Sequence, residues 1–363
     1  MFTLLVLSRF DESGAGPRYR IYQYFDSLKK HGISIVTKPL LNSEYLSKLY
    51  FSQKRSAWHL FKKYIERMNF LLFNKSKYDL VLMDGELFPF IPYFVEKLFL
   101  PSRYVIDQDD AIFHTYDQSK YLFIRWLLGN KIDKIMKNSA HVIIGNSYVK
   151  QRAEKSGAKK VTALPTVLDS NIYKPITTIK QQENQIVIGW VGSPTTAWSL
   201  SLIKDALANV AKKSNIVLHV IGADYKIDGL NIICENWPNG WSEEQEIKLI
   251  NQIDIGIMPL LDAPYQKGKC GFKLIKYMAC EKPMIASAVG MNLEIVDHDI
   301  NGYLASTQAE WEKYLLTLIN NPELRDKFGK NGRKKMESEF SLQVTAPVIC
   351  DIVINTYKNQ INV

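Results

Sequence analysis

Residues 267–287 read KGKCGFKLIKYMACEKPMIAS, and this stretch carries the clearest structural signal in the chain. Apolar residues recur at helical spacing over 272–279, and a short apolar run follows at 283–286. A helical pattern that leads directly into a buried strand is typical of a strand–helix–strand unit. The stretch therefore predicts a parallel sheet with helices packed on its faces.

The same alternation of apolar runs and helical patterns extends over the whole chain of 363 residues. We expect strands at 2–7, 33–37, 80–83, 104–106, 142–145, 186–191, 217–221, 232–234, 255–258 and 283–286. Helices are expected between them, among others at 19–31, 119–138, 199–213, 242–252, 272–279 and 308–320. This order predicts an α/β protein with doubly wound parallel sheets.

The chain is too long for one ordinary core, so two domains are expected. A polar stretch without periodicity at 177–185 has the composition of a linker, and a new buried strand begins after it. We predict Rossmann-like domains over 1–175 and 176–340. Residues 341–363 are expected to add a C-terminal helix that packs back on the N-terminal domain.

Composition narrows the class of protein. Apolar residues make up 46% and charged residues 23%, as in a soluble globular enzyme. The four cysteines are scattered and form no Cys-x-x-Cys pair, which argues against a zinc site or a disulfide framework and for a reducing, cytoplasmic compartment. No apolar run reaches the length of a membrane span.

Much of the net charge of +9 lies in residues 48–77. The basic residues there are Lys48, Lys54, Arg55, Lys62, Lys63, Arg67, Lys75 and Lys77, and the interleaved aromatics are Tyr50, Phe51, Trp58, Phe61, Tyr64, Phe70 and Phe73. The segment fits a helical pair with a solvated basic face, or an amphipathic surface that rests on anionic lipid at the inner face of the cell membrane. Nucleic-acid binding is less supported, because no base-reading motif accompanies the charge.

A glycine loop follows the first expected strand. Gly14, Ala15, Gly16 and Arg18 open a helix, and backbone N–H groups at a helix N-terminus bind phosphate. The spacing differs from the Gly-x-Gly-x-x-Gly fingerprint, which argues against NAD. A tight turn with surface arginines is the structural alternative.

Clustered carboxylates follow the fourth expected strand, in the order Asp107-Gln108-Asp109-Asp110. Such a cluster suits a general base, a metal site or a clamp for sugar hydroxyls. We prefer the hydroxyl clamp, because a hard cation needs more oxygen ligands than the sequence places here. A helix cap by Asp109 or Asp110 is the alternative.

The C-terminal half carries the strongest signal for an anion. Lys273 falls in the first turn of the expected helix, where a lysine is electrostatically misplaced unless an anion is bound. Lys267 and Lys269 precede it, with surface charge as their alternative role. Gly192, Ser193 and Thr195 follow the strand at 186–191, where small and hydroxylated residues let a phosphate approach the backbone. An ordinary capped helix start is the alternative for this loop.

A second loop, after the strand at 283–286, contains Gly290, Met291 and Asn292. Its amides are placed to touch a sugar or phosphate group. Glu294, near the start of the next helical stretch, is placed to accept hydrogen bonds from sugar hydroxyls. Compensation of the helix dipole is the alternative role for Glu294.

Together these motifs resemble the retaining nucleotide-sugar glycosyltransferases of the GT-B fold, in the large family 4 group. The resemblance covers nearly the whole chain and rests on 269–287, 290–294, the turn Asn301-Gly302-Tyr303, 192–196, 14–20 and 107–110. It implies two Rossmann-like domains that face an interdomain cleft. It also implies hexosyl transfer with retention from a UDP- or GDP-sugar to a glycan or lipid-linked acceptor, in cell-surface polysaccharide or glycolipid synthesis.

The resemblance implies no cofactor and no essential metal, because positive side chains stabilise the departing diphosphate. Lys273, with Lys269, takes that role. Glu294 holds the donor, 14–16 lies near the reacting centre, and Asp109 or Asp110 contacts hydroxyls.

The chain departs from the family pattern at several positions. Glu281 stands where a glycine is common, and Ser193 and Trp198 replace the usual arginine and lysine after the strand at 186–191. The family carries paired glutamates around the helix at 272–279, and Gly268 and Lys276 stand in their places. A lysine cannot accept the bonds that the second glutamate receives from ribose hydroxyls. A non-catalytic GT-B scaffold or partner subunit with a degenerate donor site is therefore one alternative, and a sugar-nucleotide epimerase of the same fold is another.

Overall fold

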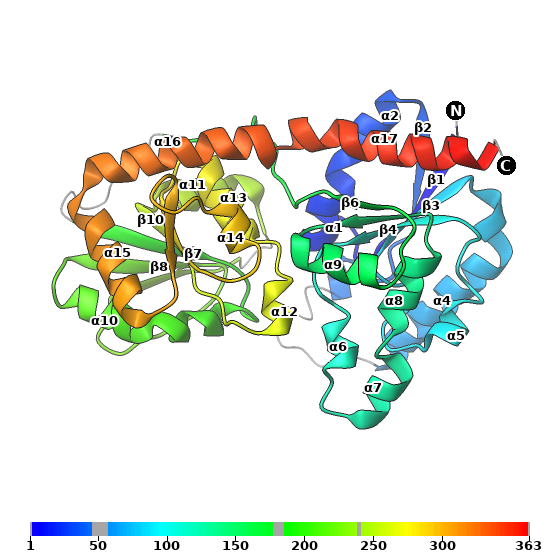
Figure 1. Ribbon diagram of the computed structural model, residues 1–363, viewed down its shortest axis with the longest axis horizontal. Coiled ribbons are helices and arrows are strands. Elements are labelled where there is room, and N and C mark those ends of the chain that lie inside the picture. Colours follow the sequence, from blue (N-terminus) through cyan, green and yellow to red (C-terminus); the bar gives the residue numbers. More distant parts are fainter. Residues whose placement is uncertain (1, 46–56, 177–184, 238–240, 362–363) are drawn as a thin grey trace. The chain divides into compact units, whose positions relative to one another are not determined.

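The computed structural model describes residues 2–45, 57–176, 185–237 and 241–361 (Figure 1). They form two compact units. The N-terminal unit comprises Met1–Thr166, Gly268–Cys270 and Thr345–Val363, and the C-terminal unit comprises Val167–Lys267 and Gly271–Val344. Each unit has a six-stranded sheet whose neighbouring strands are all parallel, so the predicted α/β class with doubly wound sheets is confirmed.

The sheet of the N-terminal unit has the order β2-β1-β3-β4-β5-β6. Its strands are β1 (Phe2–Leu7), β2 (Ile33–Thr37), β3 (Leu80–Asp84), β4 (Tyr104–Gln108), β5 (His141–Ile144) and β6 (Val161–Ala163). The chain leaves β1 in one direction to form β2 and then returns to β3 on the other side of β1. The gap between β1 and β3 is therefore the topological switch point, where ligands bind in such sheets.

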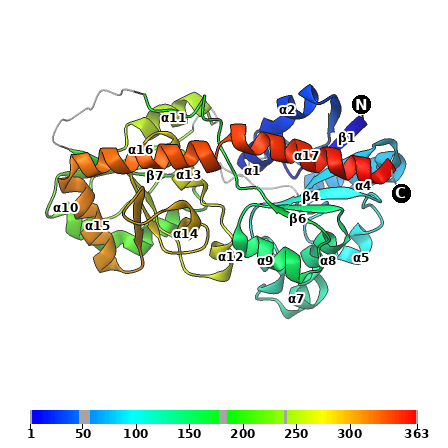
Figure 2. The same ribbon diagram turned by 45° about the horizontal axis from the view of Figure 1, so that its top comes forward.

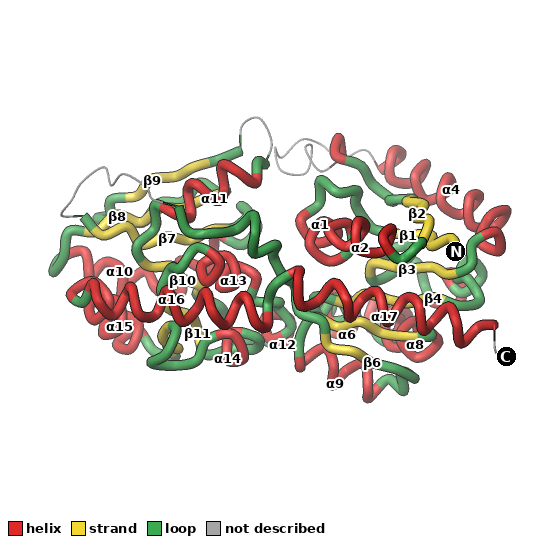
Figure 3. Tube along the Cα trace, turned by 90° about the horizontal axis from the view of Figure 1, so that it is seen from above, coloured by secondary structure: helices red, strands yellow, loops and turns green. Residues whose placement is uncertain are grey.

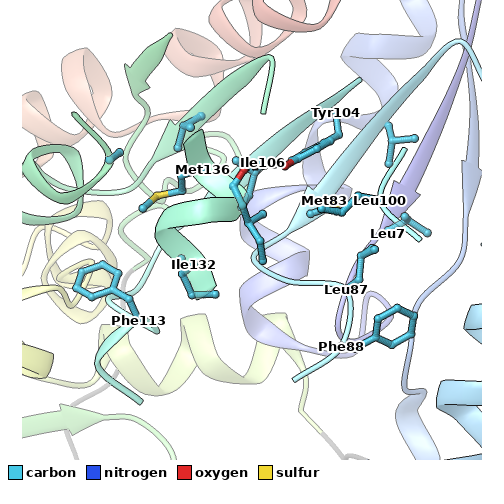
Figure 4. Packing of buried hydrophobic residues seen from close by; sticks show 14 of the residues in the cluster. Leu7, Met83, Leu87, Phe88, Leu100, Tyr104, Ile106, Phe113, Ile132 and Met136 are labelled. Atoms are coloured by element: carbon cyan, nitrogen blue, oxygen red, sulfur yellow. Dashed lines mark hydrogen bonds between the residues drawn. The ribbon is translucent and has the colours of Figure 1, made fainter. Parts of the chain in front are cut away.

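Strand β1 shows why this sheet forms. Leu4, Leu5, Val6 and Leu7 are all buried, because helices cover both faces of a parallel sheet. Figure 4 shows part of the core on one face, where Leu7, Met83 and Ile106 project from three adjacent strands. The continuous apolar run of β1 thus explains its position inside the sheet.

The helices of the N-terminal unit are shorter than the sequence predicts. They are α1 (Ala15–Arg20), the 3₁₀ turn η1 (Tyr22–Tyr24), α2 (Phe25–Lys30), α4 (Ala57–Asn74), η2 (Lys75–Lys77), α5 (Tyr93–Glu96), α6 (His114–Asp117), α7 (Leu122–Leu128), α8 (Lys131–Asn138) and α9 (Ser147–Lys155). The single helices predicted at 19–31 and 119–138 are both divided. Gly129 and Asn130 separate α7 from α8, and both residue types have low helix propensity.

The C-terminal unit has the order β12-β11-β10-β7-β8-β9, with its switch point between β7 and β10. Its strands are β7 (Ile186–Val191), β8 (Ile216–Ile221), β9 (Ile232–Glu235), β10 (Ile255–Met258), β11 (Met284–Ser287) and β12 (Gly302–Ala305). Its helices are η3 (Ala197–Ile203), α10 (Lys204–Ala211), α11 (Glu243–Asn251), α12 (Pro264–Lys267), α13 (Phe272–Ala279), α14 (Asn292–Ile295), α15 (Gln308–Asn320) and α16 (Pro322–Glu339). A further helix, α17 (Leu342–Ile361), begins in this unit and continues into the N-terminal unit (Figure 2).

Several sequence-based expectations fall on residues outside the described ranges. Of the basic and aromatic segment 48–77, residues 48–56 are outside them, and so are 177–184 of the expected linker. Within the described part of the chain, no helix combines the length and the apolar character that crossing a membrane requires.

Two glycines let α16 pack closely on α13 and the turn that follows it. A Cβ at Gly329 would collide with the backbone carbonyl oxygen of Glu281, and a Cβ at Gly332 would lie 3.2 Å from the side chain of Met278. Both glycines are buried. Because Glu281 offers a backbone atom, it cannot move aside as a flexible side chain would.

We predict that Gly329→Ala lowers the free energy of unfolding by about 1–3 kcal/mol through overpacking. The matched control is Gly16→Ala in α1, where a Cβ would meet nothing within 4 Å. Alanine there leaves stability unchanged or slightly higher. Urea unfolding followed by circular dichroism measures both, and equal stabilities of the two variants would contradict this packing.

Candidate functional site

Lys273 is the centre of the candidate site in the C-terminal unit. Gly271 caps α13 in the left-handed conformation (φ 66°), and Lys273 follows in the first turn. The ammonium nitrogen lies 5.0 Å from the centroid of the Trp190 ring and 3.0 Å from where a Cβ would stand on Gly192. The lysine predicted to meet an anion is therefore held beside the carboxyl end of β7.

Tyr277, one turn further along α13, fixes the helix on the sheet. Its hydroxyl accepts a hydrogen bond from the backbone N–H of Val191 (3.1 Å) and lies 3.2 Å from the carbonyl oxygens of both Gly189 and Ile257. The ring packs where a Cβ on Gly256 would be only 2.5 Å away. This side chain thus joins β7 to β10 at the switch point and sets the distance of Lys273 from both strands.

The glycines that follow β7 and β8, Gly192 and Gly222, have no room for a side chain. A Cβ on Gly192 would collide with Trp190, and one on Gly222 would collide with the carbonyl oxygen of Gly192. The hydroxyls of Ser193 and Thr195 lie 2.8 Å apart just after Gly192. A cation, backbone and hydroxyl groups in this arrangement suit a phosphate group.

The loop after β11 packs on the segment that leads into α13. Gly290 has a φ of 55°, and a Cβ there would collide with the carbonyl oxygen of Lys267. Asn292 is buried, and its Nδ2 donates to the carbonyl oxygen of Ser287 at 2.9 Å. Its Oδ1 is buried without a hydrogen-bond partner, 3.7 Å from where a Cβ on Gly271 would stand.

The other predicted residues of the C-terminal unit are more peripheral. Met291 is buried beside Gly271, whereas Glu294 is exposed and its carbonyl oxygen accepts from Lys335 at 2.9 Å. Lys267 forms a solvated ion pair with Asp262 at 3.0 Å. The structure thus brings Lys267, Gly290, Met291 and Asn292 together around the start of α13.

Lys276, which stands in place of a family glutamate, has a counter-charge that the sequence analysis missed. Its ammonium lies 2.6 Å from a carboxylate oxygen of Glu246 in α11. Glu246 also accepts hydrogen bonds from the Tyr173 hydroxyl (2.9 Å) and from Trp241 Nε1 (3.0 Å). Burial alone would raise the pKa of Glu246, but the charge of Lys276 and these hydrogen bonds outweigh it and lower the pKa.

In the N-terminal unit each acidic residue at the end of β4 and just after it has a polar partner. Asp107 makes a buried two-point ion pair with Arg20, at 2.5 and 3.0 Å. Asp109 accepts from the Thr166 hydroxyl at 2.7 Å, and Asp110 pairs with Lys269 at 2.9 Å. The segment Gly268–Cys270 belongs to this unit, so Lys269 is placed with the acidic cluster and Lys273 with the C-terminal unit.

Asp109, Asp110 and Cys270 offer ligand atoms within 4.8 Å of one another. Their chemistry fits a metal poorly. A hard cation prefers six or more oxygen ligands, and the two carboxylates here are already bonded to Thr166 and Lys269. The arrangement is better suited to accepting hydrogen bonds from hydroxyl groups.

The predicted glycine loop opens α1, with Gly14 as its N-cap. Arg18 donates to the carbonyl oxygens of Glu12 (2.8 Å) and Ser13 (2.7 Å), which closes the loop on itself. A Cβ on Gly14 would lie 2.8 Å from that of Phe10, whereas Ala15 and Gly16 are exposed. Arg20, in the same helix, links the loop to the acidic cluster through Asp107.

The sequence analysis did not select Asp84, at the end of β3 beside the N-terminal unit's switch point. Its carboxylate accepts from the backbone N–H of Arg9 at 3.0 Å. Burial raises its pKa to about 6, and the nearby charges of Asp107 and Asp109 add to the shift. An acid after a strand was visible in the sequence, but only the fold shows that it lies next to the first strand's loop.

Parts of the chain are similar in sequence to known glycosyltransferases. Residues 175–335 match the family model described as glycosyl transferases group 1. An uncharacterized glycosyltransferase of Methanocaldococcus jannaschii is 40% identical over 83 residues, which cover 22% of this chain and 23% of that protein. A capsular polysaccharide biosynthesis glycosyltransferase of Staphylococcus aureus is 28% identical over 174 residues, 46% of this chain and 45% of that protein. The chain thus matches less than half the length of these curated relatives.

Solved structures resemble the whole chain. Sucrose-phosphate synthase of Thermosynechococcus elongatus has a TM-score of 0.74 at 13% identity, over 99% of this chain and 100% of that one. HepE of Anabaena in complex with UDP-glucose has a TM-score of 0.69 at 14% identity, over 98% and 100%. These structures confirm the predicted GT-B architecture, and the match to glycosyl transferases group 1 extends over residues 175–335.

The pair Lys276–Glu246 gives a pH-dependent prediction. Glu246→Gln leaves a buried ammonium without a counter-charge, so we expect the free energy of unfolding at pH 7 to fall by about 3–5 kcal/mol. The greater stability of the wild type over Glu246→Gln depends on the ionised Glu246 carboxylate, whose pKa is lowered by folding. It is therefore present above the ordinary value of 4.5 and disappears as the pH falls below it.

Thermal melts of both proteins between pH 7 and pH 3 measure this difference. The double variant Glu246→Leu/Lys276→Met removes both charges and serves as the control, with most of the stability retained at pH 7. If the difference in melting temperature between wild type and Glu246→Gln stayed constant over this pH range, the assigned ion pair would be contradicted.

Proposed function

We propose that this chain, whose residues 175–335 match the glycosyl transferases group 1, moves a sugar from a nucleotide-diphosphate donor to a glycan or lipid-linked acceptor. The resemblance seen in the sequence adds that the anomeric configuration is retained. It also adds that the chemistry needs no metal.

The position of Lys273 is the observation that carries this proposal. Its ammonium lies beside Gly192 at the carboxyl end of β7, next to the switch point of a parallel sheet. A diphosphate at this point would meet a positive charge and the hydroxyls of Ser193 and Thr195. In the reaction, the bond between the sugar C1 and the diphosphate oxygen breaks and its electron pair stays on the diphosphate. Lys273 stabilises the negative charge that develops there.

The remaining roles follow from where the residues lie. The acceptor hydroxyl oxygen forms the new bond to C1, and its proton passes to the departing diphosphate oxygen. Asp109 in the N-terminal unit is the group we assign to accept hydrogen bonds from a sugar hydroxyl, since its carboxylate is oriented by Thr166. Gly290, Met291 and Asn292 are assigned to the donor sugar, and Glu294 to its hydroxyls.

UDP-sugars are the first donors to test. HepE, a protein of similar fold, has been solved with UDP-glucose, and GDP-sugars remain the second choice. A capsular polysaccharide glycosyltransferase among the relatives favours cell-surface polysaccharide as the product. We place the reaction in the cytoplasm, at the inner face of the cell membrane where such acceptors are assembled.

Lys273→Ala should lower nucleotide release by at least about a hundredfold, because a preorganised charge on the leaving group is lost. Lys273→Arg should recover part of the rate. The control is Lys330→Ala, which removes an exposed lysine of α16 paired with Asp326. The measurement is the release of UDP or GDP after the donor is mixed with an acceptor extract. It is made with and without EDTA, because the proposed chemistry needs no metal. Activity equal to wild type in Lys273→Ala would overturn the assignment.

A non-catalytic scaffold and a sugar-nucleotide epimerase are the two alternative functions. Gly268 and Lys276 replace the family glutamates, which favours a non-catalytic scaffold. Against this, Glu246 neutralises the charge of Lys276 within the fold. Calorimetry distinguishes the readings, because a degenerate site gives no heat with UDP or GDP. A sugar-nucleotide epimerase would convert the donor without any acceptor.

A further inference from the structure

The N-terminal unit exposes an unusual set of large apolar side chains. They lie on α4, on residues 90–98 and on α7 with the residue before it: Trp58, Phe61, Ile65, Leu72, Phe73, Phe90, Phe94, Leu98, Tyr121, Leu122, Phe123 and Trp126. Trp126 is 78% exposed, Phe73 75% and Trp58 73%. We call these residues the aromatic surface. In the described C-terminal unit, Trp198 is the one aromatic among the exposed large apolar side chains.

Helix α4 carries apolar side chains on both its inner and its outer side. Leu71 is buried on the inner side, and Tyr64 and Met68 pack partly buried against the core. Trp58, Phe61, Ile65 and Leu72 are spaced by three, four and seven residues, which places them in one stripe on the outer side. A helix that only packed on this core would expose polar residues there, so the outer stripe needs a second apolar partner.

The three segments of the aromatic surface are neighbours in the fold. The Tyr64 hydroxyl of α4 donates to the carbonyl oxygen of Pro89, and Lys75 donates to that of Leu98 at 2.7 Å. The backbone N–H of Phe90 donates to the Tyr116 hydroxyl in α6, which leads into α7. Figures 1 and 3 show α4 beside the sheet, and Figure 1 shows α5, α6 and α7 on the same side of it, with α7 furthest from the strands.

Phe90 is held in a backbone conformation that aromatic residues seldom adopt. Its φ is 61°, and its ring is exposed with an edge-on contact to Tyr116. Tyr116 donates to Glu86 at 2.7 Å, and Glu86 is paired with the buried Lys131. A buried ionic network therefore maintains an unfavourable backbone that presents an apolar ring to the outside.

Positive charges surround these apolar residues. Lys62, Lys97, Lys120 and Arg125 are exposed, and the Lys120 ammonium lies 5.0 Å from the Tyr121 ring. In the described residues of these segments, Glu66 is the one exposed carboxylate, and it pairs with Lys63 at 2.8 Å. Protein interfaces are depleted in lysine, whereas aromatic rings interleaved with cations are typical of a surface that rests in lipid headgroups.

We propose that the aromatic surface docks the protein on an anionic lipid bilayer, with α7 as the part that inserts. The side chains of Leu122, Phe123 and Trp126 enter the boundary between headgroups and acyl chains, while the cations bind lipid phosphates. The surface extends well beyond segment 48–77, because α7 and residues 90–98 lie outside it. The inference rests on the proposed function only in its purpose, which is to bring the protein to a lipid-linked acceptor.

The test uses the full-length protein and sedimentation with vesicles. We expect binding to phosphatidylcholine vesicles that contain phosphatidylglycerol, and much weaker binding to phosphatidylcholine alone or at high salt. Phe123→Ser/Trp126→Ser should weaken the binding at least about tenfold, because two apolar side chains leave the bilayer. Trp198→Ser is the matched control and should bind as wild type does.

Three further measurements distinguish membrane docking from a loss of folding, from dimer formation and from a loss of catalysis. Phe123→Ser/Trp126→Ser should keep the wild-type melting temperature, since both side chains are exposed. Lys273→Ala should bind vesicles normally, so failure of catalysis and failure of docking give different results. The proposal is overturned if anionic vesicles are not bound or if Phe123→Ser/Trp126→Ser binds them as wild type does. It is also overturned if the double substitution instead disperses a dimer seen at high protein concentration.

Discussion

The positive charge of Lys273 beside the carboxyl end of β7 is the interaction on which the candidate site depends. A lysine in the first turn of a helix opposes the helix dipole, so its position is unfavourable in the absence of an anion. The fold nevertheless holds it there, because Tyr277 anchors α13 to β7 and β10 and Gly192 leaves room for the ammonium. The arrangement is that of a phosphate site built from a lysine ammonium and a strand end that carries no side chain at Gly192.

The fold was largely predictable because most strands are buried on both faces and read as continuous apolar runs. Strands β6 and β12 were missed, and both are short edge strands. An edge strand of three or four residues buries too little apolar surface to leave a clear pattern. The division of the predicted helices at 19–31 and 119–138 was also missed. In 119–138 the apolar spacing continues across Gly129 and Asn130, whose low helix propensity was the local sign of the break.

The candidate site was predictable where the signal was local. Lys273 was selected by its conflict with the helix dipole, and Gly192 by its place after a strand. Glu246 was not, because it lies in another helix, 30 residues from Lys276, and appears in the sequence as an ordinary helical acid. The roles of Asp84 and Tyr277 likewise depend on which strands are adjacent, which the order of elements along the chain does not determine.

The exposure of the aromatic residues of α7 could not be predicted from the sequence either. Residues 119–138 carry a helical pattern in the sequence, and apolar residues in such a pattern are normally assigned to the core. Only the fold shows that Phe123 and Trp126 face outward. The outward-facing rings therefore became a candidate surface only once the fold was known.

A crystal structure of the protein with bound UDP tests the central claim most directly. The account predicts a diphosphate oxygen within hydrogen-bonding distance of Lys273 Nζ, with the phosphates beside Gly192 and Ser193 at the end of β7. A nucleotide bound elsewhere, with the Lys273 ammonium directed into solvent, would contradict it.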